Sequence, residues 1–218
     1  MKIIEKLLPD NCYRNGRKDK IDSLIIHYIS AVNIDRNDPY NIDKIIQIFK
    51  DYKVSAHYLI TRRGGIYLLT KEEDTAYHAG KSSLEGKSNV NNFSIGIELV
   101  GNNTVDFTDS QYLSLIQLTK DILARNNIPI SRIAGHSDVS PGRKIDPGRH
   151  FDWKRYVDGL EMEKENDEQS ENKLINKHNN DTEDNIENQE LPKKETEESW
   201  LTTLINIIKS FFGGTNAS

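Results

Sequence analysis

Apolar residues in the first 160 positions follow two periods, one typical of strands and the other of helices. Buried strands are predicted where apolar and β-branched residues run together, at 23–30, 55–70 and 92–101. The middle segment is interrupted by Gly64–Gly65, which indicates a hairpin. Helices are predicted where apolar residues recur three and four positions apart, after Asp38–Pro39, after Thr108 and at 151–160.

These elements predict one mixed α/β domain over residues 1–160, with a central mixed β-sheet flanked by helices. Strands alternate with helices, as in a parallel sheet, but the hairpin requires at least one antiparallel pair. Thr108 is the expected N-cap of the second helix, which we expect to end near Asn126–Asn127, before Pro129.

The remaining residues differ in composition. Residues 161–198 carry 14 Asp or Glu against 5 Lys or Arg, so we interpret them as a disordered acidic linker rather than as a solvated charged helix. Residues 199–218 again show the apolar pattern of one helical face, between Trp200 and Phe212. We expect this amphipathic C-terminal helix to pack on its own domain or to self-associate. Contact with a membrane surface is the weaker alternative, because Lys209 is its one basic residue.

Charge and composition exclude several classes of function. The net charge of -5 comes from the linker, and no basic stripe with interleaved aromatic residues is present, so nucleic acid is not an expected partner. Cys12 is the single cysteine, which rules out an intramolecular disulfide. The N-terminus lacks the apolar core of a secretory signal, and no apolar run approaches the roughly 20 residues that span a bilayer. A cytoplasmic protein is therefore expected.

Titratable side chains gather in a segment, residues 134–153, that fits neither helix nor strand by its apolar pattern. Asp146–Pro147–Gly148 is a turn signature, in which we expect Gly148 to take a positive φ. Pro147 favours an extended Asp146, so the side chains of Lys144 and Asp146 would leave the backbone on the same side. His136 lies ten residues upstream. A histidine and a carboxylate are two ligands of a zinc site, and a catalytic zinc requires a third.

His27 is the best candidate for that third ligand, because an imidazole without a partner in an apolar strand would be costly. A core histidine bonded to a carbonyl is the alternative, and the residues alone leave both open. No HExxH or CxxC motif is present to decide between them.

Five separated motifs together resemble one enzyme family: IIHYIS, SAHYLITRRGG, YHAGKSS, NNFSIGIELVG and GHSDVSPGRKIDPG. Their order and spacing are similar to those of the zinc-dependent N-acetylmuramoyl-L-alanine amidases of the amidase type 2 family, AmpD-like branch, over roughly residues 10–158. The resemblance implies hydrolysis of the amide between N-acetylmuramic acid and L-alanine of peptidoglycan fragments, with the 1,6-anhydro form favoured as substrate and intact peptidoglycan as the open alternative. It also implies the amidase and peptidoglycan-recognition-protein fold.

The same resemblance implies the site residues. One Zn²⁺ per chain would be held by His27, His136 and Asp146. Glu98 would act as the proton acceptor, although a buried strand carboxylate is otherwise a paired structural group. Lys144 would stabilise the transition state.

Other polar residues and other functions stay open. His57 and His78 either line the cleft or support the ligands, or have plain core or surface roles. Arg143 and Arg149 are expected to be solvated surface residues, with pairing to a substrate carboxylate as the lesser alternative. A non-catalytic peptidoglycan-binding protein on the same fold is the main alternative, although it would typically lose a zinc ligand. A cysteine hydrolase using Cys12 is disfavoured, because that residue is expected in a loop rather than at an activating helix start.

Overall fold

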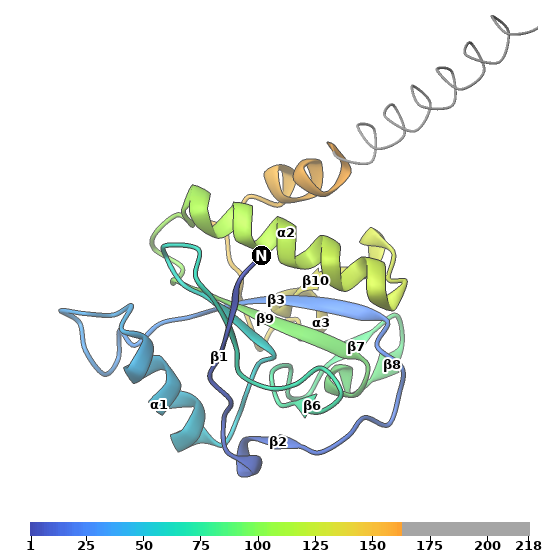
Figure 1. The fold of residues 1–218 in the computed structure, drawn as a ribbon, viewed down its shortest axis with the longest axis horizontal. Coiled ribbons are helices and arrows are strands. Elements are labelled where there is room, and N and C mark those ends of the chain that lie inside the picture. Colours follow the sequence, from blue (N-terminus) through green and yellow to red (C-terminus); the bar gives the residue numbers. More distant parts are fainter. Residues whose placement is uncertain (163–218) are drawn as a thin grey trace, which may run out of the picture. The chain divides into compact units, whose positions relative to one another are not determined.

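Six strands form one mixed sheet in the computed structural model, which describes residues 1–162 of the 218-residue chain (Figure 1). The strand order is β1-β5-β4-β9-β3-β10. Neighbouring strands run parallel except for the antiparallel β4–β5 hairpin. The predicted mixed α/β fold with a central mixed sheet is therefore confirmed.

The strands of this sheet are β1 (Ile3–Glu5), β3 (Ser23–Ile29), β4 (Tyr58–Ile60), β5 (Ile66–Leu68), β9 (Ser94–Val100) and β10 (Ile133–Gly135). Two small ribbons add β2 (Tyr13–Arg14) paired with β6 (Thr75–Ala76), and β7 (Ser83–Leu84) paired with β8 (Lys87–Ser88). The helices are α1 (Ile42–Tyr52), α2 (Asp109–Asn126), the single turn α3 (His136–Val139) and a helix at 153–162. None of the helices in residues 1–162 is long and apolar enough to cross a membrane.

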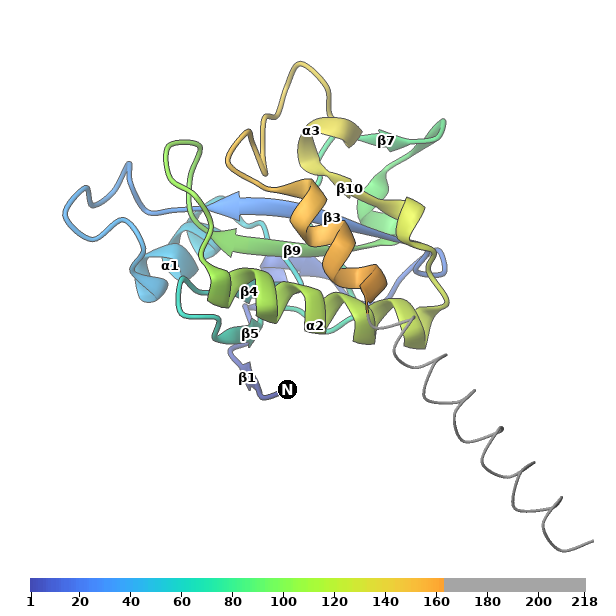
Figure 2. The same cartoon turned by 90° about the horizontal axis from the view of Figure 1, so that it is seen from above.

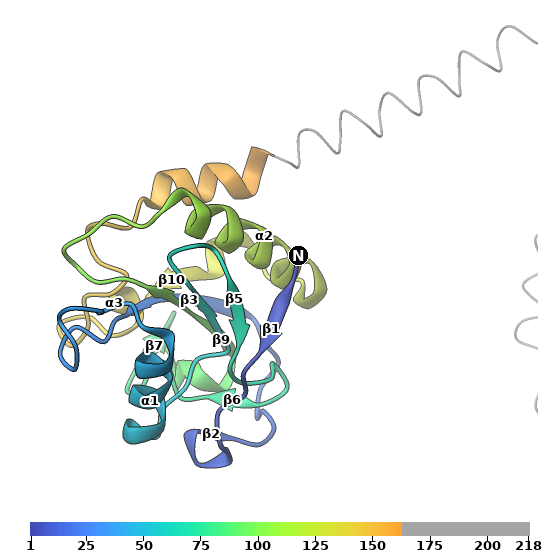
Figure 3. The same ribbon diagram turned by 60° about the vertical axis from the view of Figure 1, so that its left-hand side comes forward.

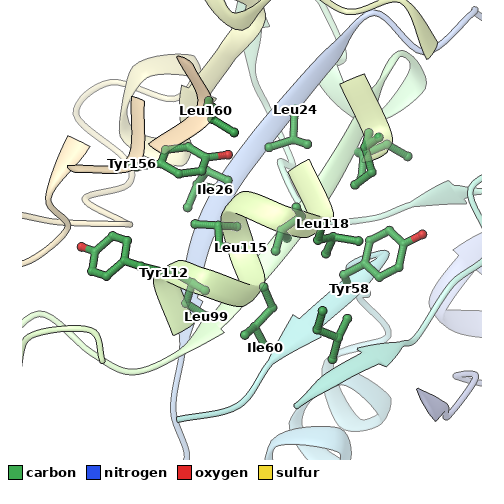
Figure 4. Close-up of a cluster of buried hydrophobic side chains, with 14 of the residues drawn as sticks. Leu24, Ile26, Tyr58, Ile60, Leu99, Tyr112, Leu115, Leu118, Tyr156 and Leu160 are labelled. Atoms are coloured by element: carbon green, nitrogen blue, oxygen red, sulfur yellow. The ribbon is translucent and has the colours of Figure 1, made fainter. Parts of the chain in front are cut away.

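One face of the sheet is buried under α2 and the helix at 153–162. Alternate residues of β3 and β9, such as Leu24, Ile26 and Leu99, point to this face and meet Leu115 of α2 and Tyr156 of the last helix (Figure 4). Figure 2 shows α2 lying along the strands with the last helix beside it. This cluster leaves the opposite face of the same strands free to carry polar groups.

The opposite face is apolar only at its two ends. At one end α1 packs with Ile45 and Phe49 against Leu59 and Val100, and α1 and α2 lie on opposite sides of the sheet (Figure 3). At the other end Ile25 packs with a smaller apolar cluster. Between the two clusters the central strands carry polar residues, and the candidate site lies there.

The helix ends show which sequence signals were correct. Thr108 caps α2 with a full capping box, and Asn127 ends the helix in the left-handed conformation, as expected. The first helix begins later than Asp38–Pro39, because the Asn41 side chain accepts the backbone N–H of Lys44 and makes Ile42 the first helical residue.

The segment 134–153 also differs from its expected irregular structure. Its first two residues close strand β10, and the next four form α3. The Asp146–Pro147 bond is cis, and Gly148 has the expected positive φ, at 75°. Apart from residues 161 and 162, the predicted acidic linker (161–198) lies outside the described residues, and so does the whole predicted C-terminal helix (199–218). The predicted domain boundaries therefore stay predictions.

Candidate metal centre and active site

The three predicted ligands come from three adjacent elements. His27 lies on the central strand β3, and His136 follows directly after β10, which runs parallel to β3. In this parallel pair Gly135 lies opposite Ile26, so the next residues of the two segments, His136 and His27, lie side by side. Asp146 reaches the same point from the loop after α3, whose backbone is tied back where its carbonyl accepts the N–H of Ser137. All three residues are buried.

One atom of each residue converges on a common point. His27 Nδ1 lies 2.9 Å from His136 Nδ1 and 3.0 Å from Asp146 Oδ2, and His136 Nδ1 lies 2.9 Å from the same oxygen. Donors around a tetrahedral zinc, with bonds of about 2.0–2.1 Å, are roughly 3.3 Å apart. The cluster is slightly tighter than this and needs only a small expansion to hold such an ion.

Outer hydrogen bonds determine which ring nitrogen of each histidine faces the cluster. His136 Nε2 lies 3.1 Å from the carbonyl oxygen of Ala79, which can only accept, so this nitrogen carries the proton. His27 Nε2 lies 3.0 Å from His78 Nδ1. If His27 donates there, both Nδ1 atoms are bare, and three acceptors meet with no proton among them. A cation would satisfy all three, so the donor set fits a metal ion.

The protonation states agree with metal binding. Burial lowers the pKa of His27 to about 4, although the neighbouring Asp146 carboxylate opposes this shift, so this imidazole is neutral at pH 7. Burial alone would raise the pKa of Asp146, but the imidazoles of His136 and His27, whose Nδ1 atoms lie 2.9 and 3.0 Å from its Oδ2, hold it below the ordinary value. Neutral imidazoles and an ionised carboxylate are the forms that bind metals.

Glu98 lies beside this cluster on β9. It pairs directly with His27 across the two strands, so both side chains leave the same face. Its Oε2 atom is buried and finds no hydrogen-bond partner among residues 1–162. Burial raises the pKa of Glu98 well above its ordinary value, and the charge of Asp146 acts in the same direction while Lys144 opposes it. A buried carboxyl with a raised pKa and no partner is poised for proton transfer rather than for structural support.

Lys144 completes the arrangement from the loop that carries Asp146. Its side chain is exposed and lines an open cavity of about 650 Å³ together with Glu98, His136 and Asp146. A positive charge at the rim can stabilise negative charge that develops on a substrate inside the cavity. The structure thus brings four of the five predicted site residues to the wall of one cavity, and the fifth, His27, contacts two of them from behind the wall.

The remaining histidine and arginine candidates differ in whether they contact the site. His78 lines the cavity and contacts His27, whereas His57 accepts the backbone N–H of Gly96 at its Nδ1. Arg143 is not simply solvated, because its Nη2 donates to the carbonyls of Ala79 and Lys81 at 2.6 and 2.9 Å. It holds the carbonyl that receives the proton of His136.

Two alternatives that the sequence analysis disfavoured also find no support in the contacts. Arg149 is exposed and donates to the neighbouring His150. Cys12 is buried in the apolar cluster under α1, and burial raises the pKa of its thiol, which opposes formation of a nucleophilic thiolate.

Gly96 is a site residue that the sequence interpretation missed. A Cβ atom at this position would lie 2.5 Å from Cγ of His78, so only glycine lets that ring lie against β9. The signal was available as a glycine inside an otherwise apolar strand. The Ala79 carbonyl had no comparable signal, because any residue supplies a carbonyl.

Three nitrogen and oxygen atoms that could hold a metal ion, with an acid–base group beside them, are the arrangement expected of a hydrolase active site. The family comparison agrees with this class. Residues 17–149 match the family model described as N-acetylmuramoyl-L-alanine amidase (Amidase_2), and the chain belongs to this family.

Individual relatives extend the similarity beyond the matched core. The chain is 43% identical over 180 residues to the 1,6-anhydro-N-acetylmuramyl-L-alanine amidase AmpD of Haemophilus influenzae, covering 73% of this chain and 98% of the relative. Among solved structures, an AmpD derivative superposes with a TM-score of 0.61 at 31% identity, covering 72% and 94% of the two chains. AmiD of E. coli, solved with the substrate anhydro-N-acetylmuramic acid-L-Ala-D-gamma-Glu-L-Lys, gives a TM-score of 0.56 at 32% identity, covering 67% and 60%.

Proposed function

We propose that this protein is a zinc-dependent amidase that cleaves the bond between N-acetylmuramic acid and L-alanine in peptidoglycan fragments. The single observation that carries the proposal is the convergence of three bare ligand atoms beside a buried, unpaired carboxyl. Family membership supports the bond that is cleaved.

His27, His136 and Asp146 would hold one zinc ion per chain through the three atoms that lie 2.9–3.0 Å apart. When bound, zinc supplies a Lewis acid that polarises a carbonyl and makes a water molecule more acidic. The chain's contribution is to orient both imidazoles with Nδ1 toward the ion, through the Ala79 carbonyl and His78.

Glu98 is the proton carrier in this proposal. Its carboxylate takes a proton from the attacking water, and the resulting acid gives that proton to the nitrogen of the leaving L-alanine. A raised pKa suits both steps, because the group must accept a proton and then release it at neutral pH.

Lys144 stabilises the negative charge that the substrate carbonyl oxygen develops during attack. Its ammonium group belongs to the same loop as Asp146, which keeps the cation beside the metal ligands. Contacts of this kind contribute roughly 3–4 kcal/mol to transition states in other enzymes.

The proposed substrate is the 1,6-anhydro form of the muropeptide. The names of the relatives support it, since AmpD is a 1,6-anhydro-N-acetylmuramyl-L-alanine amidase and AmiD was solved with an anhydro-muropeptide. Incubating the purified protein with anhydro-muropeptide and, in parallel, with intact peptidoglycan, followed by mass spectrometry of the products, tests the choice. Release of peptide from both substrates at equal rates would contradict the preference.

A non-catalytic binding protein on the same fold is the alternative. The complete ligand set and the unpaired Glu98 both argue against it, since binding alone requires neither. A chelator should abolish peptide release and added zinc should restore it, while a thiol-blocking reagent should have no effect because Cys12 is buried. Binding without any release in the presence of zinc would favour the alternative.

Two sequence predictions belong with this proposal. The cytoplasmic location is tested by cell fractionation with marker proteins for each compartment. Packing of the C-terminal helix on its own domain, or self-association, is tested by removing residues 163–218. Truncation should change stability or oligomeric state and leave the turnover of soluble muropeptide near that of the full chain.

A further inference from the structure

A chain of hydrogen bonds runs from the metal cluster into the protein interior through His78, whose ring also lines the cavity. His27 Nε2 lies 3.0 Å from His78 Nδ1, and His78 Nε2 lies 3.1 Å from the hydroxyl oxygen of Ser94. The Ser94 hydroxyl in turn lies 2.6 Å from the carbonyl oxygen of Val90. His27, His78 and Ser94 are all buried, so water does not compete for these bonds.

The direction of each bond follows from the end of the chain. The Val90 carbonyl can only accept, so the single hydroxyl proton of Ser94 points to it. The Ser94 oxygen is then left to accept, and His78 must donate from Nε2. A neutral His78 has a bare Nδ1, which accepts the proton on His27 Nε2. That leaves His27 Nδ1 without a proton, and this is the atom that faces His136 and Asp146.

The surroundings of His78 hold its ring in place. A Cβ atom at Gly96 would overlap the ring, which lies against the backbone of β9. The Asn91 side chain accepts the backbone N–H of His78 and that of Ala79, which fixes the segment that carries the ring. Ring position and proton position are therefore both determined by the chain, before any ligand is bound.

We propose that His78, supported by Ser94, is a positioning residue that fixes the tautomer and orientation of His27 for metal binding. The inference rests on the proposed zinc site and extends it to residues that do not touch the ion. Without the His78 acceptor, His27 is free to carry its proton on Nδ1, where it would point at the other two ligands and oppose a cation. Partners of this kind typically change metal affinity or activity by about 10–100-fold.

The test compares two substitutions at His78. His78→Leu removes the acceptor, and His78→Asn restores one, because its Oδ1 can reach the position of Nδ1. His57→Leu is the matched control. His57 is also buried, directly before β4, but its ring bonds to Gly96 and Arg17 rather than to a ligand.

Three readouts are needed for each folded variant: thermal unfolding of the metal-free protein, zinc affinity by competition with a chromophoric chelator, and the visible spectrum of the cobalt-substituted protein. We expect His78→Leu to lose about 10–100-fold in zinc affinity with a shifted cobalt spectrum. His78→Asn should recover most of the loss. His57→Leu should lower the unfolding temperature while leaving zinc affinity and the cobalt spectrum near wild type.

Wild-type affinity and the variant series report on different claims. If the wild-type protein binds no zinc, the proposed metal centre itself is wrong. If wild type binds zinc and His78→Leu binds it equally well, or His57→Leu loses as much, the positioning role is wrong and the metal centre stands. Should His78→Leu fail to fold, Ser94→Ala takes its place, because it keeps the ring and removes only its acceptor. It is expected to weaken zinc binding in the same direction, and unchanged affinity there would overturn the inference.

Discussion

Replacing Glu98 by glutamine should make the protein more stable and almost inactive. The wild-type carboxyl is buried on β9 with Oε2 unpaired among the described residues. Leaving a buried polar group without a partner costs about 1–3 kcal/mol, and a charged group costs more. Glutamine has nearly the same shape and cannot ionise, so Glu98→Gln removes the charged form and keeps the packing.

The stability gain should depend on pH with a definite sign. Because burial raises the pKa of Glu98, the folded chain binds this proton more tightly than the unfolded chain does. The stability that this proton gives the wild-type protein is therefore lost as the pH rises from about 4.3, the pKa in the unfolded chain, through the raised pKa in the folded chain. Glutamine does not titrate. The stability difference should be smallest in acid and should grow to about 1–3 kcal/mol at higher pH, which is roughly 2–4 °C per kcal/mol for a domain of this size.

Urea unfolding of both metal-free proteins between about pH 4 and pH 8 measures this difference directly. The zinc-loaded variant should bind muropeptide but lose about 100-fold or more in kcat. A stability difference that stays constant across this range would show that Glu98 is not the unpaired, desolvated carboxyl described here. Near-wild-type kcat would refute its role as proton carrier.

Other changes should separate rate, metal affinity and stability. Lys144→Ala should keep its zinc by metal analysis and lose about 100–1,000-fold in kcat; an unchanged kcat would remove its role. Gly96→Ala should force the His78 ring away from its 2.5 Å contact, lowering stability by about 1–3 kcal/mol and weakening zinc binding, and wild-type values of both would contradict the steric argument. Tyr156→Phe breaks a buried 2.6 Å bond to Thr119 and should cost about 1–2 kcal/mol in urea unfolding with kcat unchanged, since it lies on the opposite side of the sheet.

Periodicity predicted the elements that bury most apolar surface. The strands around His27 and Glu98, the β4–β5 hairpin and the capped helix α2 all have strong local signals, because their side-chain pattern follows their own backbone geometry. Strand β10 was missed for the opposite reason. It has three residues, and its existence depends on pairing with β3, which lies more than a hundred positions earlier.

The site residues could be predicted from the sequence to different degrees. Spacing alone suggested His136 and Asp146 and left His27 open, since a ligand and a satisfied core histidine look alike in one sequence. The family resemblance supplied the choice and the two catalytic candidates. The support from His78, Ser94 and Arg143 required three-dimensional contacts, because each acts through a carbonyl or ring that the chain brings close only after folding.

Hydrolysis of anhydro-muropeptide in ¹⁸O-labelled water, read by mass spectrometry of both products, tests the central claim most directly. The account predicts two products from the zinc-loaded protein, with one ¹⁸O in the new carboxyl group of the muramic acid and none in the peptide, whose L-alanine nitrogen leaves as an amine. Intact substrate after incubation with zinc-loaded protein, or label in a peptide carboxyl group from cleavage at another amide, would contradict it.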